Sequence, residues 1–221
     1  ASNEALFEAL TKDFTANGFN VKHLIRTIVT SATYQLSSEP NATNQHDDKY
    51  YSKYVVKRLP AEVILDAMSQ VTGRPSRFDG YPAGTRAMQL PAVRVKSEFL
   101  DVFGRPSRII CDVGERSQEP SIAQALHVIN GETLNGKLRA PGSNAGLFLK
   151  LGLSDARIVE QIFLSAFSRF PTAEEKLRLT SALKQAREQG GTPEARLLAR
   201  REALEDLLWV LLSSKEFLFN S

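Results

Sequence analysis

Three consecutive helical patterns in the last third of the chain, residues 154–212, most constrain its fold. In the first pattern, apolar residues recur at three- and four-residue steps behind Ser154, which can cap the helix. Thr172 and Glu175 then have the spacing of a capping box, and Pro193 suits the first turn of the last helix. Because the breaks between the patterns are short and polar, we expect these helices to pack as an antiparallel bundle.

The final helix is predicted to turn one row of leucines inward. The row consists of Leu197, Leu204, Leu208 and Leu211. Beyond it, Phe217, Leu218 and Phe219 would form an exposed apolar patch if they stayed in solvent, so we expect them to fold back into the core.

The first third of the chain also predicts helices. An apolar repeat of Leu6, Phe7, Leu10 and Phe14 precedes an Asn-Gly pair at positions 17 and 18, which is typical of a helix end. Asn20 can cap a second helix, whose apolar stripe extends over residues 21–36. A third helix is expected to begin at Pro60 and to stop at Gly73.

The middle of the chain is the least regular part and is rich in Gly, Pro and Arg. Its segments TRAMQL (85–90) and RIICDV (108–113) are compatible with short strands. The pentapeptide GRPSR occurs twice, at 73–77 and 104–108, which we interpret as recurring turn chemistry and not as a structural repeat.

The predicted fold is therefore all-α, a helical bundle with an irregular Gly/Pro/Arg-rich central insert that has room for short strands. We expect a single domain over residues 1–221. Its parts are N-terminal helices (1–73), the irregular insert (74–118) and a C-terminal helical bundle (119–221).

Charge and cysteine usage exclude several classes of protein. The net charge is only +3, and Lys and Arg alternate with Asp and Glu along most helical segments, which disfavours a dedicated nucleic-acid binder. A single cysteine rules out an intrachain disulfide and a Cys-rich zinc site. No apolar run is long enough to predict a transmembrane segment, and no signal peptide is visible. The chain starts directly in a helical pattern, so we expect a domain cut from a longer protein.

Several blocks in a fixed order resemble one family over essentially the whole chain. These blocks are FTANGFNVKHLIRTIVTSATYQLSS (14–38), YVVKRLPAEVILDAMSQVTG (54–73), FGRPSRIICDVGERSQEPSIAQALHVINGETLNGKL (103–138), IVEQIFLSAFSRFPTAEE (158–175) and EALEDLLWVLLSSKEFLFN (202–220). They are similar to the planctomycete-type domain of unknown function 1553. The resemblance implies the C-terminal domain of a long exported bacterial protein whose upstream regions include a cytochrome c-like domain. It implies no reaction.

The sequence departs from the family pattern at one place. The family often carries a second cysteine in a Cys-x-Cys-Glu-Arg segment, whereas Val113 takes that position here and Gly114 is inserted before Glu115. This chain therefore gives no support to a metal or redox role for a cysteine pair, and it contains no Cys-x-x-Cys-His haem motif.

Catalytic chemistry has two weak candidates, Glu115 and His127. His127 could serve Cys111 as the base of a thiol nucleophile, because a thiolate needs a neighbouring base. The alternative, which the apolar neighbours of His127 favour, is a packing histidine whose polar atoms find partners. Cys111 likewise follows two isoleucines and is compatible with a buried small hydrophobe.

No cofactor and no metal site is predicted. The three histidines, His23, His46 and His127, lack the spacing that places two ligands on one helix face. The run QHDDKY (45–50) is typical of a solvated loop, with weak cation binding as the alternative. The glycines of GYPAG (80–84) lack the lysine of a phosphate-binding loop.

The arginines of the middle region are the candidate ligand-binding residues. Arg105, Arg108 and Arg116 could converge on sulfate, phosphate or uronate groups, with Arg74 and Arg77 in the same basic wall. The favoured alternative for Arg116 is an internal bridge to a carboxylate. Near it, Glu119 or Ser117 can cap a helix whose first turn takes Pro120.

Two functions stay open at the level of sequence. The first is an accessory or interaction domain that receives upstream domains of the same polypeptide or a partner protein. The second is a binding module or enzyme that acts on an anionic polysaccharide through an Arg-rich central cleft.

Overall fold

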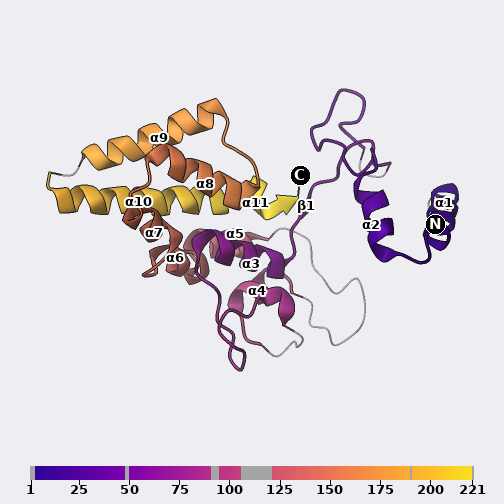
Figure 1. The fold of residues 1–221 in the computed structure, drawn as a ribbon, viewed down its shortest axis with the longest axis horizontal. Helices are drawn as coiled ribbons and strands as arrows, with labels where there is room; N and C mark the ends of the chain where they lie inside the picture. The colour runs from indigo at the N-terminus through magenta and orange to yellow at the C-terminus, as the bar shows by residue number, and fades with distance from the viewer. Residues whose placement is uncertain (1–2, 48–49, 91–94, 106–120, 190, 221) are drawn as a thin grey trace. The chain divides into compact units, whose positions relative to one another are not determined.

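The computed structural model describes residues 3–47, 50–90, 95–105, 121–189 and 191–220 (Figure 1). Helices dominate these residues, and the only strands among them are two residues long, so the all-α prediction is confirmed. The chain divides into two compact units, unit 1 (residues 1–57) and unit 2 (residues 58–220).

Unit 1 consists of two helices followed by turns. Helix α1 (Glu4–Ala16) begins behind Asn3, and helix α2 (Val21–Val29) begins behind Asn20, as its sequence predicts. The Asn20 side chain accepts a hydrogen bond of 3.1 Å from the backbone N–H of His23. The two helices contact each other, and His23 Nε2 lies 2.9 Å from a carboxylate oxygen of Asp13. None of the described residues of unit 1 is buried.

Helix α2 is shorter than the predicted segment 21–36 and ends at Val29. The N–H of Ser31 donates to the carbonyl oxygen of Ile28, three residues back, at 3.1 Å, so the α-helical hydrogen-bonding pattern stops at this turn. The apolar stripe continues in the sequence beyond it.

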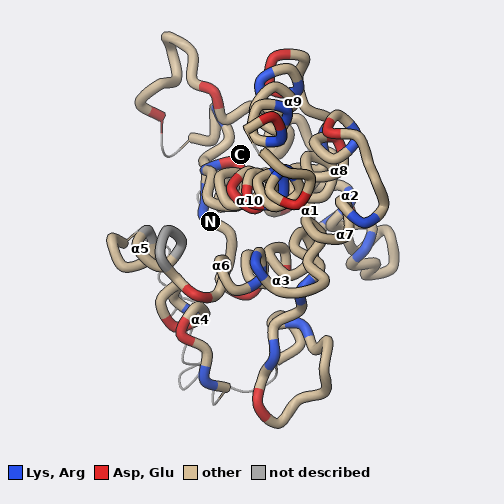
Figure 2. Tube along the Cα trace, turned by 90° about the vertical axis from the view of Figure 1, so that its left-hand side faces the viewer, with Lys and Arg blue, Asp and Glu red and all other residues tan. Residues whose placement is uncertain are grey.

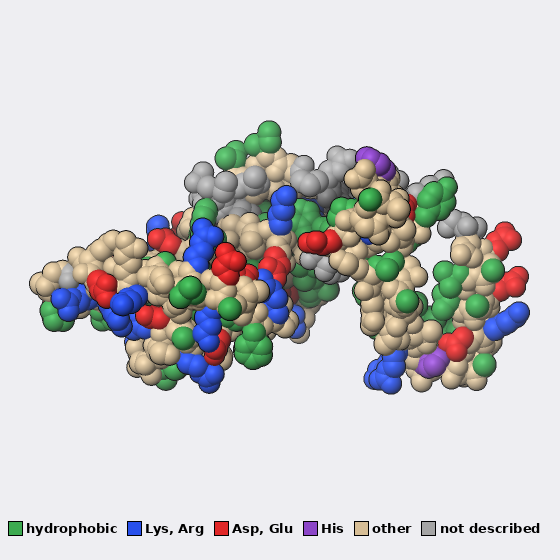
Figure 3. Space-filling view, turned by 90° about the horizontal axis from the view of Figure 1, so that it is seen from above, with side chains coloured by type: hydrophobic (Ala, Val, Ile, Leu, Met, Phe, Trp, Pro, Cys, Tyr) green, Lys and Arg blue, Asp and Glu red, His purple; other side chains and the backbone are tan. Residues whose placement is uncertain are grey.

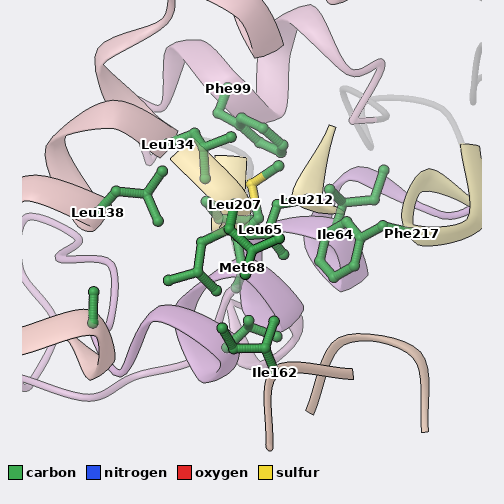
Figure 4. Close-up of a cluster of buried hydrophobic side chains, with 14 of the residues drawn as sticks. Ile64, Leu65, Met68, Phe99, Leu134, Leu138, Ile162, Leu207, Leu212 and Phe217 are labelled. Carbon is green, nitrogen blue, oxygen red and sulfur yellow. The ribbon is translucent and has the colours of Figure 1, made fainter. Parts of the chain in front are cut away.

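Unit 2 is built around helix α3 (Ala61–Thr72), which contacts η1, α4, α6, α7 and α8. Its surrounding short helices are η1 (Ala87–Gln89), α4 (Glu98–Val102), α5 (Ile122–Asn130), α6 (Glu132–Arg139) and α7 (Asn144–Lys150). Figure 4 shows Ile64, Leu65 and Met68 of α3 meeting leucines and aromatic side chains from several other helices. This cluster is the hydrophobic core.

The last third forms the expected bundle of α8 (Asp155–Phe167), α9 (Ala173–Glu188) and α10 (Pro193–Leu212), which lie side by side (Figure 1). The predicted capping box is present, since Thr172 Oγ1 accepts from the N–H of Glu175 and the Glu175 carboxylate accepts from the N–H of Thr172. The predicted leucine row is wrong at Leu197, which is 57% exposed. The buried leucines of α10 are Leu204, Leu207, Leu208 and Leu212.

The end of the chain returns to the start of unit 2. Helix α11 (Lys215–Leu218) follows α10, and Phe217 is buried in the core, as predicted. Strand β2 (Phe219–Asn220) then pairs with strand β1 (Lys57–Arg58). The N–H of Leu59 donates to the carbonyl oxygen of Leu218 at 2.9 Å.

Two further expectations are corrected in unit 2. Residues 87–89 form the 3-10 helix η1 and not a strand, because the buried carboxylate of Asp66 accepts hydrogen bonds from the N–H groups of Ala87 and Met88. Helix α5 begins at Ile122, later than Pro120. Ser121 caps it because Ser121 and Gln124 satisfy each other's backbone N–H groups.

Acidic and basic residues both occur along α9, where the tube of Figure 2 has red and blue segments. Within the described ranges, no helix has the length and apolar character needed to cross a membrane.

Candidate anion-binding cleft

Both GRPSR copies follow closely on the end of a helix, α3 at Thr72 and α4 at Val102. Gly73 after α3 has φ 68°, and Gly104 after α4 has φ 76°, the left-handed conformation that glycine adopts without a steric penalty. In both copies the next N–H bonds back into the helix, from Arg74 to Ser69 at 3.0 Å and from Arg105 to Leu100 at 2.8 Å. The recurrence of the pentapeptide is therefore explained, in the part that is described, by helix termination.

Arg105, from the second copy, is turned into the protein. Its side chain is 9% exposed, and Nη2 donates to Asp101 Oδ1 and to the carbonyl oxygen of Val95, both at 2.8 Å. Its Nη1 is buried without a hydrogen-bond partner among the described residues. Arg105 thus fastens local backbone, and it does not line the cleft described next.

Arg74 and Arg77, from the first copy, line a cleft of about 640 Å³. Lys96 and Lys137 line the same cleft, so four cations surround it. Within the described part of the chain, the side chains of Arg74, Arg77 and Lys96 form no ion pair. The carboxylates in the lining are those of Glu98 and Glu132. Of the arginines that the sequence places in one basic wall, Arg74 and Arg77 line this cleft and Arg105 does not, and sequence reasoning missed Lys96 and Lys137.

Lys137, on α6, is the most constrained of these cations. Its Nζ donates to the carbonyl oxygen of Arg74 at 2.7 Å, to Ser76 Oγ at 2.9 Å and to Ser69 Oγ at 3.0 Å. Burial, assisted by the nearby charge of Arg74, lowers the pKa of this amine to about 8. No local pattern in NGKLR (135–139) announces this role, because the partners of Lys137 lie on α3 and on the loop after it.

His127, on α5, lies behind residues of the same cleft. Its Nε2 is 3.2 Å from Thr133 Oγ1, its Nδ1 is 3.8 Å from Glu98 Oε1, and its side chain is 8% exposed. Its ring contacts Phe99 and Phe103 edge-on. Both nitrogens thus lie near polar groups inside an aromatic pocket, the arrangement of a packing histidine, and a catalytic role for His127 stays a prediction.

The other predicted site residues cannot be placed relative to this cleft. Arg108 and Arg116, Glu115, Cys111 and Glu119 lie outside the described residues, so the roles predicted for them stay predictions.

The histidines and carboxylates suggest no metal centre within the described ranges, since no group of three possible ligands gathers there. In the loop that carries His46, the carboxylate of Asp47 accepts from the N–H groups of Tyr50 and Ser52 and from the Ser52 hydroxyl. Asp47 thus shapes its own loop.

A family model described as PSD1, protein of unknown function (DUF1553), matches residues 1–183. No curated protein and no solved structure matches the chain.

Proposed function

The chain belongs to the PSD1 family of proteins of unknown function (DUF1553), and from its own residues we propose that it is an interaction domain whose basic cleft holds an anionic polysaccharide. In keeping with the family resemblance, we propose that it serves a larger exported bacterial protein, where upstream domains or a partner protein would share its surface.

The unpaired cations carry this proposal. An arginine whose charge is already neutralised by a carboxylate gains little from a ligand, whereas Arg74 and Arg77 keep their donors available toward the cleft. Guanidinium groups bind carboxylate, sulfate and phosphate through two parallel hydrogen bonds, which fixes orientation as well as charge. Lys96 adds a mobile point charge to the same wall.

The two carboxylates in the lining favour a saccharide over a bare anion. Glu98 and Glu132 would repel an isolated phosphate or sulfate ion, but each can accept hydrogen bonds from hydroxyl groups. A sugar residue that carries an anionic group presents both kinds of partner. A cleft of about 640 Å³ lies in the range of small-ligand pockets, and so has room for a few such residues.

Binding of a charged and an uncharged form of one polymer tests the proposal. We expect dextran sulfate or polygalacturonate to bind the full chain in isothermal titration calorimetry, and plain dextran not to bind. The Arg74→Ala and Arg77→Ala variants should each lose about tenfold in affinity, the effect of roughly 1.4 kcal/mol.

Arg178→Ala is the matched control, because Arg178 is an exposed arginine on α9 away from the cleft. Its affinity should equal that of the wild type. Equal losses of affinity in all three variants would mean that the polymer binds through the overall charge of the protein and not through the cleft. Binding of plain dextran would show that the anionic group is not required.

A further inference from the structure

Two serine hydroxyls contact the amine of Lys137 at the edge of the basic cleft. Ser76 Oγ and Ser69 Oγ lie 2.9 and 3.0 Å from Lys137 Nζ, and 3.4 Å from each other. Ser76 lines the basic cleft and also a second cavity of about 360 Å³, which Ser69 and Arg86 line as well. The Ser76 hydroxyl therefore contacts the Lys137 amine, and Ser76 lines both cavities.

The two hydroxyls are not equivalent. Ser69, within α3, donates to the carbonyl oxygen of Leu65 at 2.8 Å, so its proton is held by the helix. Ser76 lies on the loop after α3, where no backbone carbonyl among the described residues accepts its proton. Only Ser76 is therefore placed to lose a proton to an acceptor at the cleft.

We propose that Ser76 is the nucleophile, and Lys137 the general base, of an acyl-transfer site for carboxylic esters carried by the anionic polymer. This inference rests on the proposed function for the substrate's anionic part, but its chemistry rests on the Ser76–Lys137 contact alone. A serine hydroxyl is a weak nucleophile by itself and needs an adjacent base to take its proton. Lysine serves as that base in known serine–lysine sites.

The steps balance in protons and bonds. Ser76 Oγ attacks the ester carbonyl carbon while its proton passes to the neutral Lys137 amine. The resulting tetrahedral centre collapses, the bond to the leaving alcohol breaks, and that oxygen takes the proton from Lys137. Water then attacks the acyl-serine, again passing a proton to Lys137, which returns it to Ser76 Oγ as the acid is released. No oxidant, reductant or metal is needed.

The environment of Lys137 suits this task near neutral pH. A general base works best when its pKa lies near the working pH, and burial brings the pKa of Lys137 to about 8. A minor fraction of the amine is then neutral at pH 7, and this fraction grows as the pH rises through the pKa of about 8.

Small neutral reagents test the site without relying on polymer binding. The full chain would be treated with a fluorophosphonate and with p-nitrophenyl acetate, and the modified peptide would be identified by mass spectrometry. We expect Ser76 to be labelled, at a rate that rises with a pKa of about 8. Ser76→Ala should abolish labelling, and Ser165→Ala should not change it, because Ser165 donates to a carbonyl oxygen within α8.

Lys137 is tested by two variants that separate catalysis from folding. Lys137→Arg keeps a cation with several donors but cannot act as a base, and Lys137→Met removes both. Each should lower the labelling rate at least about a hundredfold, a typical contribution of general base catalysis. Thermal unfolding identifies variants that have lost their fold. A folded Lys137→Arg variant in which Ser76 is labelled at the wild-type rate would overturn the proposal. Lys137 would then have only a structural role.

The two proposals fail in different ways. Labelling of Ser76 without polymer binding would keep the acyl-transfer site and remove its anionic substrate. Polymer binding with no labelling of the wild type would keep the interaction domain and overturn the acyl-transfer site.

Discussion

Unit 1 and unit 2 are both helical, but among the residues that the structure describes only those of unit 2 form a buried core. In unit 2, helices from distant parts of the sequence bury side chains such as Ile64, Leu204 and Leu212 completely. In unit 1, apolar residues such as Leu6, Phe7 and Ile25 are more than half exposed, and Figure 3 shows apolar side chains at its surface. Both units thus contain amphipathic helices, but only in unit 2 are the apolar faces of the described helices buried by packing.

The contrast shows how little a helical pattern says about stability. Helices of nine to thirteen residues, like α1 and α2, are marginal in water without tertiary packing. The caps and the Asp13–His23 contact stabilise unit 1 locally, whereas burial of apolar surface dominates in unit 2. The free energy of unfolding should therefore reside almost entirely in unit 2.

Separating the two units should give the largest effect. A fragment of residues 58–221 should unfold in urea with one cooperative transition, and a fragment of residues 1–57 should show none, because none of its described residues is buried. Circular dichroism at 222 nm measures both. A cooperative transition in the short fragment would break the contrast.

Truncating one apolar side chain in each unit should give the next largest difference. Leu208 is 1% exposed, so Leu208→Ala should lower the free energy of unfolding by about 2–5 kcal/mol. Ile25 is 54% exposed, so Ile25→Ala should change it by less than about 1 kcal/mol. Urea unfolding of the full chain measures both. A large effect of Ile25→Ala would show that α2 is covered in solution.

An ion-pair clamp makes the stability of unit 2 depend on pH. Arg169 donates to both oxygens of Glu175, at 2.8 and 2.9 Å, and to both oxygens of Glu216, which joins the start of α9 to α11. The hydrogen bonds from Arg169 lower the pKa of Glu175 to about 2. A carboxylate whose pKa is lowered in the folded state stabilises the protein above its ordinary pKa. That contribution is lost as the pH falls toward 2.

Glu175→Gln should therefore cost about 1 kcal/mol at pH 7, a modest value because the pair is partly exposed. The difference in the free energy of unfolding between this variant and the wild type should shrink as the pH falls from 4.5 to 2. Urea unfolding at several pH values measures this difference. Glu188→Gln is the control, since its carboxylate lies 3.9 Å from Lys184 on an exposed surface and should contribute almost nothing. A gap that stays constant with pH would assign the effect to the capping box.

Removing one helix cap from each unit should give the smallest effect, with a different readout in each. Thr172→Ala removes the cap of α9 and should lower the free energy of global unfolding by about 1 kcal/mol. Asn20→Ala removes the equivalent bond from α2 and should reduce helical dichroism without changing that free energy. A global effect of Asn20→Ala would tie unit 1 to the cooperative transition of unit 2.

Local signals in the sequence were sufficient for the helices of the bundle. Ser154, Thr172 and Pro193 each mark a helix start through groups within three residues, so no tertiary information was needed. The errors arose where a distant or competing group decided the outcome. Asp66 holds residues 87–89 in a 3-10 helix through hydrogen bonds from 21 and 22 positions away. The apolar stripe over residues 21–36 did not reveal the turn that follows Val29 and ends α2.

The cleft was only half predictable for the same reason. Arg74 and Arg77 stand in a recurring pentapeptide, and this drew attention to them. Lys137 meets Ser69 and Ser76 from 68 and 61 positions away, and no periodicity or spacing records such a meeting. Three-dimensional proximity of polar groups is set by how helices pack, which a linear pattern does not contain.

The pairing of Leu59 with Leu218 constrains how unit 2 can be made. A nascent chain that has left the ribosome as far as α9 holds the N-terminal partner of this contact but not the C-terminal one, and it also lacks Phe217 of the core. Apolar faces of α3 and α8 would stay partly uncovered until α10 and α11 have been synthesised. During the synthesis of α10 and α11, unit 2 is then exposed to chaperones and proteases for a time that the speed of translation sets.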